Sequence, residues 1–127
     1  MEQLTEWAES YLRHKDLLAK KINNIKNDNN TLIIKKNTGQ ELAICTDNLE
    51  DVKINNKAKT YIFATHTKQN FETLCNRWNE LNKFPELILV FADTKNNKKW
   101  IIIPFSHSKI AGDNLKAGLK SLYDNCS

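Results

Sequence analysis

The pattern of apolar positions begins with a helical repeat. These positions are Leu4, Trp7, Ala8, Tyr11, Leu12, Leu18, Ile22 and Ile25. Spacings of three and four residues place such side chains on one side of a helix, so the pattern predicts a long amphipathic helix over residues 4–27. The polar run NDNN that follows ends this helix, and the apolar side of the helix needs another element to cover it.

Short apolar runs of strand type follow. TLIIKK (residues 31–36) and ELAICT (41–46) flank a short turn with a glycine, which predicts a β-hairpin. TYIFATH (60–66) is rich in β-branched and aromatic residues, the composition typical of a strand. ELILVFAD (86–93) is apolar almost throughout and predicts a central strand that is buried on both faces. WIIIPF (100–105) predicts a last strand that ends near its proline.

Two further segments return to helical spacing. The first predicted helix covers residues 68–82, and the second follows Asp113, a good N-cap residue. The predicted order α-β-β-β-α-β-β-α describes an α/β protein with a central mixed sheet of about five strands and helices packed on that sheet. A length of 127 residues with only two prolines and three glycines predicts one compact domain over residues 1–127.

Composition narrows the class of protein without identifying a function. The net charge of +4 and the isoelectric point near 8.9 permit an anionic partner. No apolar stretch approaches the roughly 20 residues that a membrane-spanning helix needs, so we expect a cytoplasmic protein that makes no membrane contact. Cys45, Cys75 and Cys126 are far apart and form neither a disulfide framework nor a zinc-ligand pattern.

Two short motifs connect the predicted strands to a known family. GQELA (residues 39–43) places an acid near the start of the second predicted strand, and ATH (64–66) ends the third. Together with the order of a helix, a three-stranded meander, a crossover helix and a fourth strand, these motifs resemble the restriction-endonuclease-like superfamily. That superfamily includes the PD-(D/E)xK nucleases and the archaeal Holliday-junction resolvases. The resemblance covers roughly residues 4–105 and implies a restriction-endonuclease-like core.

The resemblance implies a site from which this chain departs. In the family, an acid at the start of the second strand and an acid-x-lysine pair at the end of the third converge on a divalent metal and its attacking water. Glu41 stands in the place of the first acid, and Ala64 and His66 stand in the place of the pair. Ala64 cannot bind a metal, and His66 is shorter than lysine and mostly neutral near pH 7. The resemblance thus implies a degenerate member, with Glu41 as a candidate metal ligand and His66 in the same cleft.

Basic residues are the candidate contacts to an anionic partner. The candidates for nucleic-acid binding are Lys35, Lys36, Lys68, Lys98, Lys99, His107 and Lys109. Most of these lysines lie at predicted strand ends and turns, where they can grip a phosphate backbone without reading its sequence. The last two residues belong to FSHSKIAG, predicted as a loop whose side chains and amides can bind an anion. The alternative interpretation of all of them is a solvated polar surface.

The sequence is compatible with three functions. We expect a non-catalytic nuclease-like domain that acts as a binding module for DNA, for RNA or for a protein partner, without a cofactor. The first alternative is a nuclease that depends on Mg²⁺ or Mn²⁺ and uses Glu41, Asp47 and His66 as catalytic residues in a rearranged site. The second alternative is an unrelated α/β protein that assembles through an exposed strand edge or through its last helix.

Overall fold

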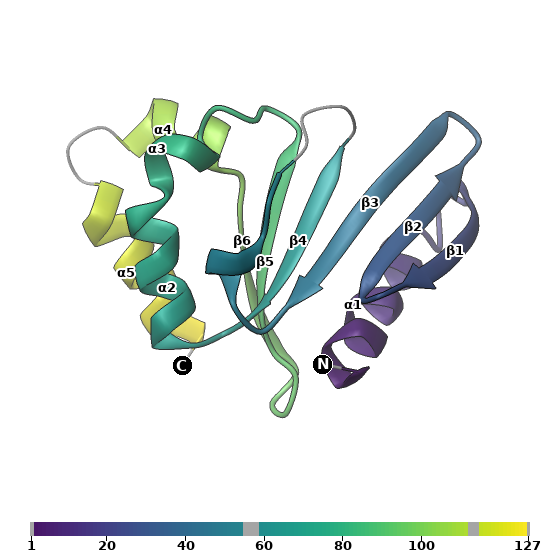
Figure 1. The fold of residues 1–127 in the computed structure, drawn as a ribbon, viewed down its shortest axis with the longest axis horizontal. Coiled ribbons are helices and arrows are strands. Elements are labelled where there is room, and N and C mark those ends of the chain that lie inside the picture. Colours follow the sequence, from purple (N-terminus) through teal and green to yellow (C-terminus); the bar gives the residue numbers. More distant parts are fainter. Residues whose placement is uncertain (1, 55–58, 112–114, 127) are drawn as a thin grey trace.

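A six-stranded mixed sheet lies at the centre of our computed structural model, which describes residues 2–54, 59–111 and 115–126 (Figure 1). The strands are β1 (Ile22–Asp28), β2 (Thr31–Lys36), β3 (Gly39–Thr46), β4 (Thr60–Thr65), β5 (Leu87–Asp93) and β6 (Lys98–Ile102). They lie in sequence order across the sheet. β1, β2 and β3 form an antiparallel meander, β4 and β5 run parallel to β3, and β6 is antiparallel to β5. The α/β class and the mixed sheet are confirmed, with one strand more than expected.

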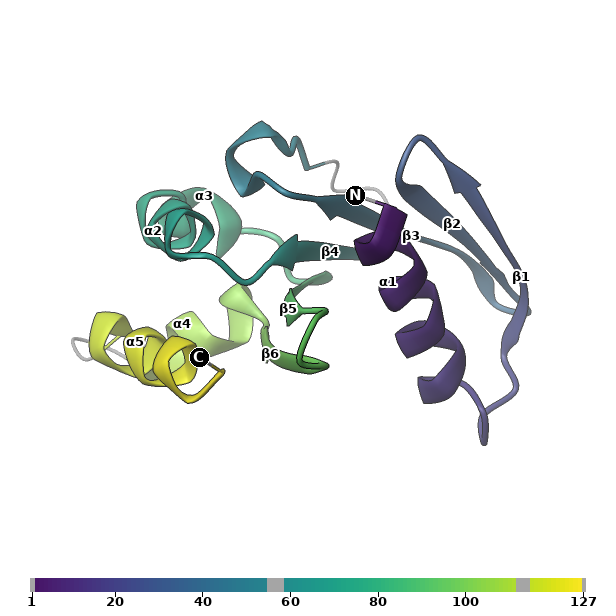
Figure 2. The same cartoon turned by 90° about the horizontal axis from the view of Figure 1, so that it is seen from below.

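Helices cover both faces of this sheet. One face carries α1 (Glu2–Lys15) (Figures 1 and 2). The opposite face carries α2 (Lys68–Asn76), α3 (Trp78–Leu81), α4 (Pro104–Ala111) and α5 (Leu115–Cys126). A short 3₁₀ helix, η1 (Leu49–Asp51), lies in the connection from β3 to β4. In the part of the chain that the structure describes, every helix is too short or too polar to cross a membrane.

Two hydrophobic cores fill the space between the sheet and its helices. β4 contributes to both, because successive side chains of a strand point to opposite faces. Ile62 and Ala64 belong to the core under α2 and α5, whereas Tyr61 and Phe63 belong to the core under α1. β5 is divided between the two cores in the same way, so the prediction of a strand buried on both faces within residues 86–93 is confirmed. Because both faces of β4 and β5 are covered, the polar residues of this part of the chain that reach solvent lie mainly beyond the ends of the two strands.

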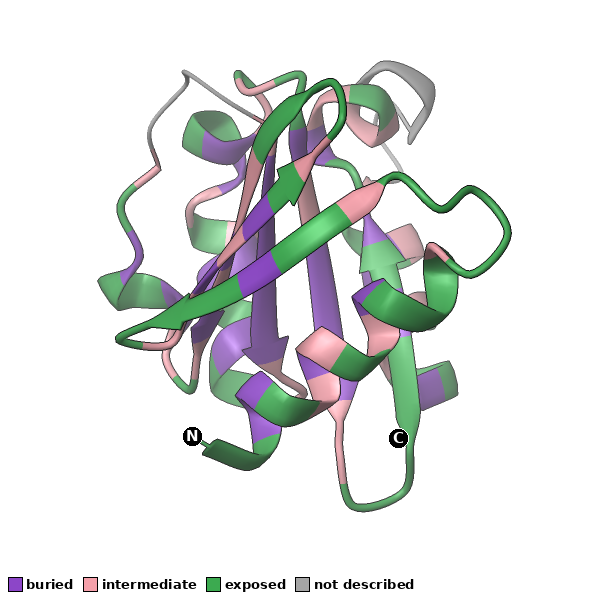
Figure 3. Ribbon diagram, turned by 90° about the vertical axis from the view of Figure 1, so that its right-hand side faces the viewer, coloured by how far each residue is buried: buried purple, intermediate pink, exposed green. Residues whose placement is uncertain are grey.

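The largest correction concerns the segment that follows α1. A continuous helix to residue 27 was predicted, but the chain turns after α1 and then forms β1. Asp16 holds the turn, because its carboxylate accepts hydrogen bonds from the amides of Lys21 and Ile22 at 3.0 and 2.8 Å. β1 is an edge strand, and Ile25 is its one buried residue (Figure 3). Its sequence thus lacks the apolar alternation that identifies a strand, and the two isoleucines three residues apart imitate a helix.

Two smaller corrections concern other helices. The helix predicted over residues 68–82 is divided into α2 and α3 at Arg77, whose φ and ψ are −95° and 8°. The segment FSHSKIAG was predicted as a loop, but most of it belongs to α4. α4 begins at Pro104, because the fixed φ of proline and its missing amide hydrogen suit the first turn of a helix. The predicted cap Asp113 lies outside the described residues.

Candidate functional site

Glu41 and His66 do not share a cleft, contrary to the prediction. β3 and β4 are parallel, with Leu42 opposite Thr60 and Thr46 opposite Ala64. Glu41, on β3, therefore lies beside the start of β4. His66 lies beyond the end of β4, roughly 20 Å away along the strand direction. The two side chains also point to opposite faces, because Glu41 lines a hollow with α1 whereas His66 packs against α5. The predicted proximity is wrong because residues 60–65 form β4, which runs parallel to β3, and not the third strand of the antiparallel meander.

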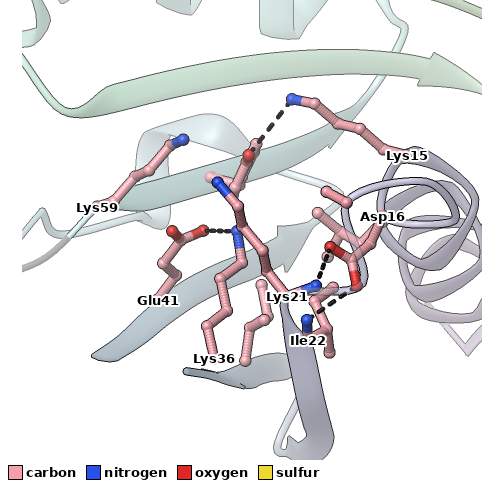
Figure 4. Close-up of a pocket in the computed structure, with 11 residues that line it drawn as sticks. Lys15, Asp16, Lys21, Ile22, Lys36, Glu41 and Lys59 are labelled. Atoms are coloured by element: carbon pink, nitrogen blue, oxygen red, sulfur yellow. Dashed lines mark hydrogen bonds and ion pairs between the residues drawn. The ribbon is translucent and has the colours of Figure 1, made fainter. Parts of the chain in front are cut away.

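Glu41 lies in a pocket between α1 and the sheet (Figure 4). The pocket has a volume of about 190 Å³ and an apolar floor that includes Leu12 and Ile34. Four lysines line it, each from a different segment of the chain: Lys15, Lys21, Lys36 and Lys59. We call these residues, with Glu41, Asp16 and Tyr61, the lysine pocket. Four ammonium groups against two carboxylates make this pocket a candidate site for an anion.

One lysine of the pocket is paired with Glu41. Lys36 Nζ lies 3.1 Å from Glu41 Oε1, and the two side chains are 18% and 17% exposed. The same Oε1 is buried and makes no hydrogen bond of good geometry, so the contact is an ion pair without an aligned hydrogen bond. This pair joins the end of β2 to the start of β3 across the hairpin. Glu41 is therefore paired with a lysine, and within the described residues it belongs to no group of acidic, histidine or cysteine side chains that could hold a metal ion.

Tyr61 contacts two more of the lysines. Lys15 Nζ donates a hydrogen bond to Tyr61 Oη at 3.5 Å. The ammonium groups of Lys15 and Lys59 lie 5.4 and 5.5 Å from the centre of the Tyr61 ring, within the range of a cation–π contact. The buried ring thus contacts two positive charges at the wall of the pocket. A bound anion could pair with these ammonium groups.

Asp16 brings a second negative charge to the pocket. Its two carboxylate oxygens accept hydrogen bonds from the amides of Ile22 and Lys21. These backbone hydrogen bonds, that from Ile22 first, lower the pKa of Asp16 below its ordinary value. The carboxylate serves the turn after α1, so its oxygens are directed at the backbone. Its negative charge also acts on Lys36 and Lys21, so the four lysines keep an excess of positive charge over Asp16 and Glu41.

His66 lies in a different environment, the aromatic cluster of His66, Phe91, Trp100 and Tyr123. Trp100 Nε1 donates a hydrogen bond to His66 Nδ1 at 3.0 Å, and the His66 and Tyr123 rings lie 4.6 Å apart. Trp100 in turn stacks on Phe91 at 4.4 Å. Desolvation lowers the pKa of His66, and the nearby charge of Asp93 offsets part of this effect. The neutral imidazole of His66 follows β4. Its hydrogen bond to the indole of Trp100 connects it to β6, and its ring contact with Tyr123 connects it to α5.

Asp47, the third predicted catalytic residue, lies at the same end of the sheet as His66. Its Oδ1 accepts a hydrogen bond from Thr65 Oγ1 at 3.3 Å, on the exposed side of the loop after β3. Glu41 is at the opposite end, so the three candidates do not form one site. Within the described ranges, moreover, no group of three or more histidine, cysteine or acidic residues is placed to hold a metal ion.

The predicted nucleic-acid contacts are scattered over the molecule. Lys36 lies in the lysine pocket and Lys35 on the exposed part of β2 beside it. The others lie on α2 (Lys68), on β6 at the far edge of the sheet (Lys98 and Lys99) and on α4 (His107 and Lys109). The His107 ring packs edge-on against Trp78 at 6.2 Å, and the side chain of Lys109 is outside the described set. These residues do not make one surface.

Sequence reasoning missed three lysines of the pocket and Tyr61. Lys15 and Lys21 looked like the polar side of one long helix, but the turn at Asp16 brings both to the start of β1. Lys59 joins them because β4 runs parallel to β3, which brings the start of β4 beside Glu41. The available signal was Asp16 itself, a residue type that favours turns. A comparison of the chain with known protein families, with curated proteins and with solved structures found no match.

Proposed function

We propose that this protein is a non-catalytic binding module that binds a nucleic acid through its phosphate groups, with the lysine pocket as the contact. The observation that carries the proposal is the convergence of Lys15, Lys21, Lys36 and Lys59 on one pocket of about 190 Å³. Lysine ammonium groups are flexible point charges that bind phosphate oxygens without requiring a fixed orientation. Such contacts supply affinity and do not read bases.

The order of elements supports a nuclease-like origin for this module. α1 is followed by an antiparallel meander and then by strands parallel to its last member, which resembles part of the restriction-endonuclease-like core. The chain departs from that core where its crossover helix would follow the meander, since the described part of the β3–β4 connection contains only η1 and the helix α2 follows β4. On this meander, the second strand starts at Thr31 and the third ends with Ile44-Cys45-Thr46. Thr31 lies opposite Ile44, so these are the positions where the family's acid and acid-x-lysine pair would meet. None of them is an acid or a lysine, which favours a binding role without catalysis.

A binding titration tests this proposal. The intact protein is titrated with fluorescently labelled single-stranded DNA, duplex DNA and single-stranded RNA at several salt concentrations. We expect binding at low salt, with the logarithm of the association constant falling linearly with the logarithm of the salt concentration. Absence of binding to all three at low salt would contradict the proposal. Incubation of the same mixtures with Mg²⁺ or Mn²⁺ should leave the strands uncut, and cleavage that a Glu41→Ala substitution abolishes would favour the nuclease alternative.

A further inference from the structure

A second hollow adjoins the lysine pocket. It has a volume of about 390 Å³, and Asp16 and Ile22 line both spaces. Arg13, Lys20 and Leu17 form the rest of its lining. Building on the proposed function, we infer that the lysine pocket takes the terminal phosphate monoester of a nucleic-acid strand. The last nucleotide of that strand then lies in the second hollow.

The size of the lysine pocket favours a chain end over a chain interior. Its volume of about 190 Å³ corresponds to roughly six water molecules in the liquid, which is room for one phosphate group and a few waters. A phosphate inside a strand carries a nucleotide on both sides, whereas a terminal phosphate carries one. The lysine pocket shares Asp16 and Ile22 with one adjoining hollow, which offers room for the single nucleotide of a chain end.

The charge of the pocket favours the same ligand. A phosphate monoester carries between about one and a half and two negative charges near pH 7, whereas a phosphodiester carries one. Lys36 is paired with Glu41, and Asp16 acts on Lys21 and Lys36 through its charge, but among the described residues no carboxylate forms a close ion pair with Lys15, Lys21 or Lys59. Three ammonium groups around one small space gain most from the more highly charged anion.

The second hollow has the composition that a nucleoside requires. Leu17 is 61% exposed and presents an apolar surface on which a sugar or the face of a base can rest. Arg13, whose Nε donates to Glu9 at 3.0 Å, keeps its guanidinium beside this surface. A planar guanidinium can stack on a base or contact the next phosphate. The two spaces thus match the two parts of a terminal nucleotide.

The test compares three short single strands of one sequence, with a 5′-phosphate, with a 3′-phosphate or with hydroxyl groups at both ends. We expect one phosphorylated strand to bind about tenfold more tightly than the strand without a terminal phosphate. Inorganic phosphate should compete for this extra affinity. A Lys15→Gln and Lys59→Gln double variant should lose the preference, and the matched Lys53→Gln and Lys83→Gln variant should keep it, since both of these lysines are exposed.

The outcomes separate this inference from the proposed function. Equal affinity for the three strands, with the expected salt dependence, would overturn the terminal-phosphate assignment and leave nucleic-acid binding in place. Failure of every strand to bind at low salt would overturn both. A preference that persists in the Lys15→Gln and Lys59→Gln variant would place the terminal phosphate elsewhere and overturn the assignment as well. Circular dichroism and thermal unfolding of each variant show that it is folded before its affinity is interpreted.

Discussion

The lysine pocket and the aromatic cluster occupy opposite ends and opposite faces of the same sheet. The pocket gathers exposed or half-exposed ammonium groups around one ion pair and a buried tyrosine. The cluster gathers aromatic rings around a histidine whose Nδ1 accepts the indole N–H of Trp100. The first region keeps its charges at the solvent, where a ligand can reach them. The second uses its polar atoms to join strands and helices.

This difference separates residues that bind from residues that hold the fold. The sequence suggests a functional role for a histidine at a strand end. In the structure, however, the ring of His66 accepts a hydrogen bond from Trp100 and packs against Tyr123. The sequence does not show that the four lysines are neighbours, because they are spread over 45 positions, from residue 15 to residue 59. Substitutions in one region should therefore leave the other region intact.

The largest effect is expected at Asn70, near the aromatic-cluster end of the sheet. Its side chain accepts from the Leu49 amide at 2.9 Å and donates to the Asp47 and Thr65 carbonyls at 3.0 and 2.8 Å. Asn70 is fully buried, so Asn70→Ala should lower the free energy of unfolding by about 3 kcal/mol, because three backbone groups lose a partner. Urea denaturation measures this, with exposed Asn76→Ala in the same helix as the control. A loss equal to that of the control would refute the role of Asn70.

The next effect concerns the pocket. A triple variant with Lys15→Gln, Lys21→Gln and Lys59→Gln keeps the Lys36–Glu41 pair but removes three positive charges. We expect its affinity for a single strand at low salt to fall about 30-fold, or about 2 kcal/mol, and its salt dependence to weaken by roughly two counterions. The control removes the same charge from exposed Lys53, Lys83 and Lys116. Equal losses in the two variants would mean that net charge alone governs binding.

A smaller effect of opposite sign is expected at Glu41. Glu41→Gln removes a negative charge from the pocket and frees Lys36 for a ligand, so binding should tighten about threefold. Glu72→Gln changes the net charge equally on an exposed position of α2 and should have less effect. The nuclease alternative predicts that Glu41 is needed to bind the metal. Weaker binding or loss of a cleavage activity in Glu41→Gln would support that alternative.

The smallest effect is a pH dependence of stability that comes from His66. Desolvation lowers its folded-state pKa below the ordinary value of 6.5, so the unfolded chain takes up the proton first as the pH falls. Stability should therefore decrease as the pH is lowered through 6.5 and toward the folded-state pKa of His66. Protonation of Nδ1 would also remove the acceptor for Trp100. Urea midpoints measured across this range should fall less in His66→Gln than in the wild type, and exposed His14→Gln should behave as the wild type.

Much of the fold could be predicted from apolar patterns, because burial imposes them. The hairpin of β2 and β3 and the central strands β4 and β5 were all predicted within a few residues of their bounds. β1 was missed because an edge strand buries little and needs no alternation. The helix α4 was missed because Pro104 suits a strand end as well as a helix start. Both errors concern elements whose identity depends on tertiary packing.

The candidate site could be predicted only in part, since its residues meet through topology. Glu41 and Lys36 lie on one hairpin, so their proximity follows from local sequence. Lys59 reaches the same place through a parallel crossover whose strand order no local pattern specifies. Lys15 and Lys21 depend on the turn at Asp16. Glu41 was therefore found for its charge, but the residues that surround it were not.

The central claim is that ligand binds at the lysine pocket and not at the aromatic cluster. An NMR titration of the ¹⁵N-labelled protein with a short single strand tests it most directly. We expect the largest amide shifts at the end of α1, around Lys21, at Lys36 to Glu41 and at Lys59 to Tyr61, while the Trp100 indole signal stays in place. Shifts concentrated at His66, Trp100 and α5, with the pocket signals unmoved, would contradict it.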